Sequence, residues 1–172
     1  MSGEGTPAPI ILTAELPRDM ASWATGLRQQ HFPPERNYLD AHVTLFHALP
    51  PACLPELATL LKRIVADAPP PPARLEGIMS LGGGTALKLS SPAMLAIRER
   101  IADHFAASLT PQDEHAPRLH VTIQNKVKSA EAKALQAQLV IEPRAFAFRA
   151  IAAHYYRGGP WERIREWPFR GA

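Results

Sequence analysis

Two short segments of the sequence each carry a histidine followed two positions later by a threonine. The first, residues 42–45, reads His-Val-Thr-Leu, and the second, residues 120–123, reads His-Val-Thr-Ile. Paired imidazoles can serve as a general base and a general acid, and hydroxyl groups can donate hydrogen bonds to phosphate oxygens as charge builds on them. Together these groups suit the cleavage of a phosphodiester. A strained cyclic phosphodiester would require neither a metal ion nor a nucleotide cofactor.

Each motif lies in a segment with the apolar content of a β-strand. Because side chains alternate between the two faces of a strand, His42 and Thr44 point one way, and so do His120 and Thr122. The apolar residues between them point to the opposite face. If a pseudo-twofold axis relates the two halves of the molecule, the two His/Thr faces can meet across one groove. Two imidazoles and two hydroxyls would then surround one small volume.

The elements around the motifs occur in the same order in both halves of the chain. The first half contains a predicted strand, helix, motif strand and helix at 10–16, 17–30, 41–46 and 55–66. The second half repeats that order at 86–89, 92–108, 119–126 and 129–139. Further strands are predicted at 74–80, 145–156 and 162–167, the first forming a hairpin with 86–89. The fold class is α+β, and the repeated order predicts an internal duplication.

The overall composition restricts the class of protein. With 172 residues, 46% of them hydrophobic, the chain can bury a substantial core, so we expect one domain of two closely packed lobes over 1–172. Its one cysteine, Cys53, excludes an internal disulfide in a monomer and a cysteine-rich zinc site. No segment resembles a signal peptide or a membrane span, so a soluble, cytoplasmic monomer is expected. A net charge of +3 attracts anions only weakly and does not suggest a duplex-DNA binder.

The doubled His-x-Thr motif, its spacing and the duplicated order of elements resemble the 2H phosphoesterase superfamily, specifically the bacterial 2'-5' RNA ligase-like and RNA 2',3'-cyclic phosphodiesterase proteins. The resemblance covers nearly the whole chain. It implies a bilobal fold of two antiparallel sheets flanked by helices, with both motifs in a central cleft. It also implies His42 and His120 as the catalytic pair and Thr44 and Thr122 as phosphate-binding residues.

One departure from that family follows the second motif. Many ligase-like relatives place an arginine there, whereas this chain has Gln124, Asn125 and Lys126. Strand alternation would keep Gln124 and Lys126 on the face of His120, so both are candidate phosphate contacts, with Lys126 supplying the cation. The alternative interpretation of Lys126 is a solvated residue at the end of a strand.

Aromatic residues near the motifs could contact a base. By alternation Phe46 shares the face of His42 and could stack on a base, or it could be a packed aromatic at the cleft edge. Tyr156 and Arg157 precede a glycine-rich turn and are candidates for the cleft rim. A metal site built from His42, His120, His47 and Asp40 is disfavoured, because the sequence has no clustered metal-binding motif.

The resemblance implies activity on 2',3'-cyclic phosphates or 2'-5' linkages, so we expect a metal-independent phosphoesterase that hydrolyses 2',3'-cyclic phosphates at RNA ends or on small nucleotides. The sequence does not decide which histidine is the base and which the acid. Reversible 2'-5' RNA joining in the same cleft is the alternative activity. A non-catalytic module that binds RNA ends or nucleotides is the alternative class.

Overall fold

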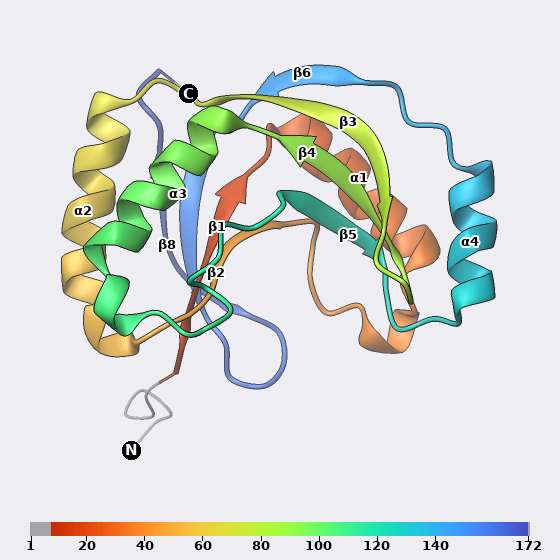
Figure 1. Cartoon of the computed structure of the whole chain (residues 1–172), viewed down its shortest axis with the longest axis horizontal. Helices are drawn as coiled ribbons and strands as arrows, with labels where there is room; N and C mark the ends of the chain where they lie inside the picture. The colour runs from red at the N-terminus through yellow and green to blue at the C-terminus, as the bar shows by residue number, and fades with distance from the viewer. Residues whose placement is uncertain (1–7, 172) are drawn as a thin grey trace.

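The computed structural model describes residues 8–171, and within them it contains eight strands and four α-helices (Figure 1). The strands form two four-stranded antiparallel sheets. The first sheet has the order β2 (Val43–Leu49), β1 (Ile10–Glu15), β7 (Ala150–Tyr155) and β8 (Glu162–Pro168). The second has the order β5 (His120–Gln124), β4 (Thr85–Ser90), β3 (Pro72–Ser80) and β6 (Arg144–Ala147). The predicted α+β class with two antiparallel sheets is confirmed.

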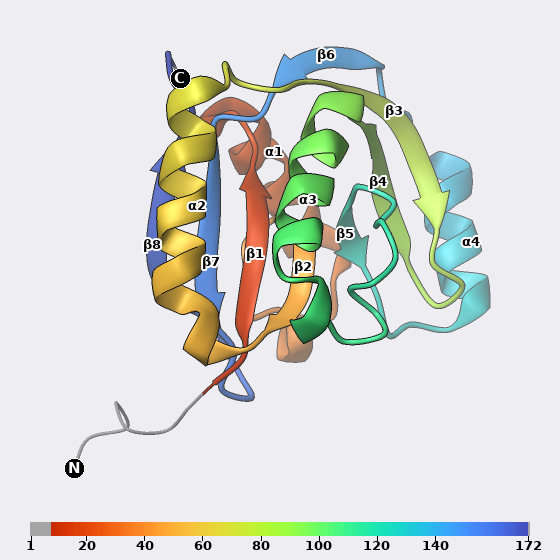
Figure 2. The ribbon, with the colours of Figure 1, turned by 60° about the vertical axis from the view of Figure 1, so that its left-hand side comes forward.

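The helices lie between and around the sheets. They are α1 (Arg18–His31), α2 (Leu54–Asp67), α3 (Pro92–His104) and α4 (Ser129–Gln138), with short 3₁₀ turns at Pro34–Arg36, Pro51–Cys53 and Ala106–Ser108. Figure 2 shows α2 running beside β7 and β8, and α4 at the opposite end of the molecule beside the second sheet. Apolar residues of α2 at helical spacing are fully buried, including Leu57, Leu61 and Ile64. None of the helices within residues 8–171 is long and apolar enough to cross a membrane.

The duplication predicted from the sequence is visible in the order of elements. In each half a strand leads into a helix and then into a motif strand, as β1–α1–β2 and as β4–α3–β5. Each motif strand lies at the edge of its own sheet, and β2 and β5 contact each other. The two edges that carry the His/Thr motifs therefore face the same groove.

The predicted late strand over 145–156 is divided in the structure. Residues 144–147 form β6 in the second sheet, whereas residues 150–155 form β7 in the first. At the crossing, the Phe148 N–H donates to the carbonyl of Pro71 and the Arg149 N–H donates to that of Glu15. The backbone therefore changes its hydrogen-bond partner from one sheet to the other between these two residues. One nearly continuous apolar segment thus contributes a strand to each sheet.

Candidate active site

Both motifs open into one cavity of about 540 Å³ between the two lobes. Its lining includes the two histidines and the two threonines of the motifs, His42, Thr44, His120 and Thr122. His42 directly precedes β2, and His120 is the first residue of β5. All four side chains are partly exposed, so each can reach a bound molecule. The tertiary structure thus brings together the four residues that the sequence motifs singled out.

The two imidazoles are held by equivalent hydrogen bonds. His42 Nδ1 lies 2.9 Å from the carbonyl oxygen of Asp40, and His120 Nδ1 lies 2.6 Å from that of Arg118. In both cases the partner is the carbonyl two residues earlier in the chain. A carbonyl oxygen can only accept, so Nδ1 carries the proton in each ring and Nε2 is left for chemistry. The duplication therefore extends to the orientation and tautomer of the histidines.

Burial shifts the protonation of His42. Its ring packs against the indole of Trp161 at a centroid distance of 4.6 Å. Burial disfavours the charged imidazolium and lowers the pKa of His42 to about 4, although the hydrogen bond to the Asp40 carbonyl opposes the shift. The nearby charge of Arg28 also lowers this pKa. His42 is therefore neutral at physiological pH, with Nε2 able to accept a proton.

A buried arginine of α1 ties the first lobe to the second motif strand. Arg28 donates to the carbonyl of Leu39 at 3.1 Å and to the side chain of Asn37, both in the loop that leads to His42. The same guanidinium donates to the carbonyl of Thr122 at 2.8 Å. Because only 3% of Arg28 is exposed, these charge-assisted hydrogen bonds are shielded from water. Arg28 thus couples the position of the His42 loop to that of β5.

A second buried arginine makes the reciprocal connection from α3. Arg98 donates to the carbonyl of Leu45 in β2 at 3.2 Å and to the carbonyl of Asp113, in the loop that leads to His120. The Asp113 carboxylate accepts hydrogen bonds from the backbone N–H groups of His47 and Ala48. Each lobe therefore holds the motif strand of the other through one buried guanidinium. The loops that lead to the two histidines differ in length, so this correspondence is not evident in the sequence.

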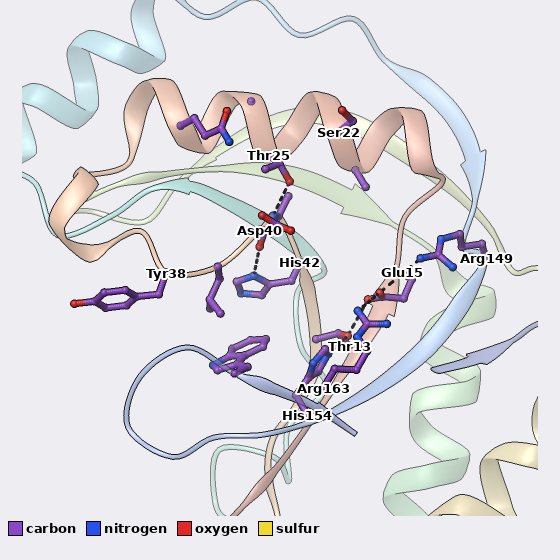
Figure 3. Close-up of a pocket in the computed structure, with 16 residues that line it drawn as sticks. Thr13, Glu15, Ser22, Thr25, Tyr38, Asp40, His42, Arg149, His154 and Arg163 are labelled. Carbon is purple, nitrogen blue, oxygen red and sulfur yellow. Dashed lines mark hydrogen bonds and ion pairs between the residues drawn. The ribbon is translucent and has the colours of Figure 1, made fainter. Parts of the chain in front are cut away.

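A third histidine, His154 of β7, lines a cavity together with His42 (Figure 3) and is not marked by any motif. Its Nε2 lies 3.0 Å from the hydroxyl of Thr13, and its ring contacts Trp161 at 5.4 Å. Burial lowers the pKa of His154 to about 4, so this ring is also neutral at physiological pH. The one sequence signal is a polar residue interrupting the apolar run of a buried strand. Trp161 has no such signal beyond its place after the glycine-rich turn.

The alternation of side chains between the two strand faces predicted Phe46 and Gln124 as further cleft residues, but this alternation ends after the threonine of each motif. Thr44 pairs with Thr13 but Phe46 pairs with Leu12, so β2 holds one extra residue between these pairs. Such a bulge changes which side chains face each side of the strand. Phe46 is fully buried, with the guanidinium of Arg98 4.2 Å from its ring centroid. Its predicted role in base stacking is therefore corrected: Phe46 is a core residue.

The second motif strand has a bulge at the equivalent place. Thr122 pairs with Ala86 but Gln124 pairs with Thr85. Gln124 is only 4% exposed, and its side-chain carbonyl accepts a hydrogen bond from the Thr85 hydroxyl at 2.9 Å. Lys126 follows the end of β5 with a left-handed φ of 61°. Both residues line a separate cavity that contains neither motif histidine, so the structure does not bring them to the predicted phosphate site.

The two candidates for the cleft rim have different positions. Tyr156 is exposed and lines a smaller cavity together with His42, Thr122 and Trp161, which places it at the rim. Arg157 does not line this cavity; it forms an ion pair with Glu162 at 2.9 Å. Among residues 8–171, no group of three or more His, Cys, Asp or Glu side chains is arranged to hold a metal ion.

The fold and the paired motifs define a duplicated α+β protein of the 2H phosphoesterase type, with one His-x-Thr edge strand from each lobe in a shared cleft. The chain belongs to the 2'-5' RNA ligase superfamily, whose family model matches residues 16–160. This range contains both motifs and His154, and it ends just before Trp161. The family comprises phosphoesterases and ligases, which supports an enzyme. No curated protein sequence matches the chain.

Solved structures share the fold at low sequence identity. Escherichia coli LigT in complex with 3'-AMP is similar with a TM-score of 0.67 and 17% identity, covering 95% of this chain and 99% of LigT. The TT0787 protein of Thermus thermophilus has a TM-score of 0.61 at 17% identity, covering 95% of this chain and 98% of that protein. A structure described as a phosphoesterase has the same values. LigT has also been solved with NADP⁺ and with ATP.

Proposed function

We propose that this protein hydrolyses 2',3'-cyclic phosphates at RNA ends or on small nucleotides, without a metal ion. One observation carries the proposal: two histidines with their Nδ1 atoms held by backbone carbonyls line a single cavity together with two threonines. This arrangement leaves two Nε2 atoms for proton transfer and two hydroxyls for phosphate oxygens. The 2'-5' RNA ligase superfamily, to which the chain belongs, supports phosphoester chemistry of this kind.

The protonation of His42 suggests its role. Neutral His42 accepts a proton from a water molecule through Nε2 as that water attacks phosphorus. His120 takes the role of the acid, and its Nε2 donates a proton to the ribose oxygen as the bond from phosphorus to that oxygen breaks. The product is a ribose monophosphate with a free neighbouring hydroxyl, and proton exchange with solvent restores both imidazoles. The hydroxyls of Thr44 and Thr122 donate to the non-bridging oxygens as their negative charge increases.

A direct assay tests the proposal. Purified protein in the presence of EDTA is given an oligoribonucleotide that ends in a 2',3'-cyclic phosphate, and the products are resolved from the substrate. We expect conversion to a terminal monophosphate. Binding without turnover at every pH from about 5 to about 8 would instead indicate a non-catalytic module for RNA ends, and would refute hydrolysis of this substrate. A second RNA strand with a free 5'-hydroxyl is added in a parallel reaction. Joining of this strand to the cyclic phosphate end would report 2'-5' ligation.

The low pKa of His42 predicts an unusual acid limb in the pH profile. The base must be neutral, so kcat/KM should fall with decreasing pH only as the pH approaches about 4, not at the ordinary imidazole value of about 6.5. Replacing Trp161 with alanine returns water to the ring, which stabilises the imidazolium. The Trp161→Ala acid limb is therefore expected to move upward toward about 6.5.

The control for this prediction is Trp23→Ala. Trp23 is an exposed tryptophan on α1 that lines none of the cavities at His42. Its removal should leave the pH at which the acid limb falls unchanged. An acid limb near about 6.5 in the unmodified protein would contradict the assignment of His42 as a base kept neutral by burial.

A further inference from the structure

A groove of about 780 Å³ lies between the end of α1 and α4 (Figure 1). Its walls come from residues 29–35 and from parts of the segment 124–138, and we call it the α4 groove. Among residues 8–171, none lines both this groove and the cavity of the paired motifs. Its lining includes Gln124 and Lys126, the two further phosphate contacts predicted from the sequence. The α4 groove therefore contains polar groups that the proposed reaction does not use.

A chain of hydrogen bonds fixes the orientation of the Gln124 amide. One atom of the Gln136 amide lies 3.1 Å from the Gly84 carbonyl and 3.1 Å from the Thr85 hydroxyl. A carbonyl can only accept, so this atom is the Gln136 nitrogen, and it donates to both groups. Thr85 is fully buried, and its own proton needs an acceptor, which Gln124 supplies at 2.9 Å. The oxygen of the Gln124 amide thus faces Thr85, and its NH₂ group is left for another partner.

The Gln124 NH₂ group has no hydrogen-bond acceptor within the described part of the chain, although only 4% of Gln124 is exposed. In residues 8–171, the fully buried side-chain nitrogens that lack a partner are Arg149 Nε and Trp167 Nε1. The Gln124 nitrogen is not one of them, so it opens to the groove that Gln124 lines. Each bond in the chain polarises the next, which strengthens this last donor. The donor is therefore suited to an acceptor on a bound molecule.

Two lysines in the lining favour a negatively charged acceptor. Lys126 follows the end of β5, and Lys128 directly precedes α4. Within residues 8–171 neither ammonium group forms an ion pair, although Glu35 and Glu131 line the same groove. Glu131 lies in the first turn of α4, where the helix dipole stabilises its charge. Both lysines can therefore neutralise an anion that approaches the Gln124 donor.

The backbone of Lys126 is held in a conformation that disfavours lysine. Its φ of 61° is left-handed, which glycine adopts without the steric cost of a Cβ. The Asn125 side chain accepts a hydrogen bond from the Lys126 N–H at 2.9 Å and supports this turn. Strain of this kind is concentrated at functional sites. Stability alone would favour glycine at this position, so the ammonium group is the feature that needs a function.

We propose that the α4 groove binds a phosphate group. The NH₂ group of Gln124 donates to one phosphate oxygen, and the ammonium groups of Lys126 and Lys128 neutralise the charge. This proposal does not rest on the proposed hydrolysis, because its residues lie outside the cavity of the paired motifs.

Two sources can supply such a group. One is a free phosphate ion. The other is the backbone of an RNA strand that continues out of the cleft. Phe32 lines both the α4 groove and the smaller cavity at His42 and Thr122, so the two hollows adjoin.

The Gln124 side chain provides a direct measurement of binding. Inorganic phosphate is titrated into the isotope-labelled full chain, and the NH₂ signal of Gln124 is followed by NMR, assigned by its loss in Gln124→Glu. We expect a saturable shift that sodium chloride at equal ionic strength does not reproduce. Signals of His120 and Thr122 report binding in the motif cavity separately. In Gln124→Glu a carboxylate oxygen replaces the donor, so the backbone signal of Val127 should lose its response to phosphate.

The lysines are tested with a matched control. Lys128→Gln should weaken phosphate binding at the Gln124 signal by about tenfold. Lys133→Gln makes the same charge change on α4 at an exposed residue outside the groove, and it should alter binding by less than about twofold. Lys126→Gly should also weaken binding about tenfold, but it relaxes the left-handed backbone, so the unfolding temperature should not fall. Weaker binding without lower stability excludes misfolding as the cause.

A second ligand distinguishes the two sources. A single-stranded oligoribonucleotide with a 2'-phosphate end is compared with adenosine 2'-phosphate. If the groove takes a strand phosphate, only the oligoribonucleotide shifts the Gln124 signal, and Lys128→Gln weakens its binding without affecting the mononucleotide. If the groove takes a free ion, inorganic phosphate saturates the signal and Lys128→Gln leaves oligoribonucleotide binding unchanged. Either pattern supports a phosphate site.

Two results would overturn the proposal. One is a Gln124 signal that responds to neither phosphate nor the oligoribonucleotide beyond the effect of sodium chloride. The other is equal weakening by Lys128→Gln and Lys133→Gln, which would indicate a general charge effect. Turnover of adenosine 2',3'-cyclic phosphate is followed in parallel. If turnover is absent while the Gln124 signal responds, the proposed hydrolysis fails and the α4 groove site stands; the reverse pattern removes only the groove site.

Discussion

Replacing either His42 or His120 with asparagine is expected to reduce the hydrolysis of a 2',3'-cyclic phosphate by about 10²–10⁴-fold. Asparagine is chosen because its side-chain NH₂ can retain the hydrogen bond that Nδ1 makes to the carbonyl two residues earlier. The substitution therefore removes Nε2, the atom assigned to proton transfer, with little change to the local backbone. The measurement is single-turnover cleavage of the oligoribonucleotide described above, alongside thermal unfolding to verify folding.

The two histidine variants should also be non-additive. Acid and base act in one transition state, so the double variant should lose less than the product of the two single losses. His104→Asn is the control, because His104 lies at the end of α3 and pairs with Glu56 outside the cavity. Full activity in either single variant would refute a mechanism with two proton-transferring histidines.

The second large effect is expected at the threonines. Thr44→Val and Thr122→Val each replace a hydroxyl with a methyl group of similar size, removing one donor to the phosphate oxygens. Losing a donor that acts mainly on the transition state typically costs about 10²–10³-fold in kcat. We expect a loss of about 10²-fold in each variant, smaller than that of the histidine variants. A measurable residual rate should remain, because both imidazoles are still present.

Steady-state kinetics separates this role from ground-state binding. The predicted pattern is a fall in kcat with little change in KM, and Thr→Ser at the same positions should recover much of the rate. Thr59→Val serves as the control, since the Thr59 hydroxyl is bonded to the Pro55 carbonyl within α2. If the valine variants raise KM alone, the hydroxyls contribute uniform binding and the proposed transition-state role is wrong.

The correspondence between the halves goes further than the motifs themselves. Each motif histidine donates to a carbonyl two residues earlier, and each motif strand bulges after its threonine. Arg28 and Arg98 then connect each helix to the motif strand of the other lobe. The positions of the four motif residues in the shared cavity therefore depend on both lobes, because the buried guanidinium groups donate hydrogen bonds to the carbonyls of Thr122 and Leu45.

The sequence predicted the features that depend on short-range geometry. Strand alternation correctly paired each histidine with its threonine, because residues i and i+2 of an unbroken strand share a face. The same rule failed at Phe46 and Gln124, since a bulge inserts one residue into β2 and into β5 at that point. A bulge depends on the partner strand, and nothing in the four-residue motif distinguishes a regular strand from a bulged one.

The late apolar run illustrates the same limit on a larger scale. Residues 145–156 have the composition of one strand, but the Phe148 N–H donates to Pro71, which directly precedes β3 of the second sheet, and the Arg149 N–H donates to Glu15 of β1 in the first sheet. The amino-acid composition indicates that a segment is buried in a sheet, but it does not indicate which of the two sheets the segment joins. That choice is made by the partners that close the backbone hydrogen bonds when both lobes are assembled.

The sequence by itself determined the α+β class, the duplication and the four motif residues that meet in the cleft, because periodicity and spacing are properties of the chain. Only the tertiary structure decided that Trp161 and His154 join them, that Phe46 and Gln124 turn away, and that a second chamber opens beside His42. These features arise from contacts between segments far apart in the chain. Burial within those contacts is also what lowers the pKa of His42 and makes it the candidate base.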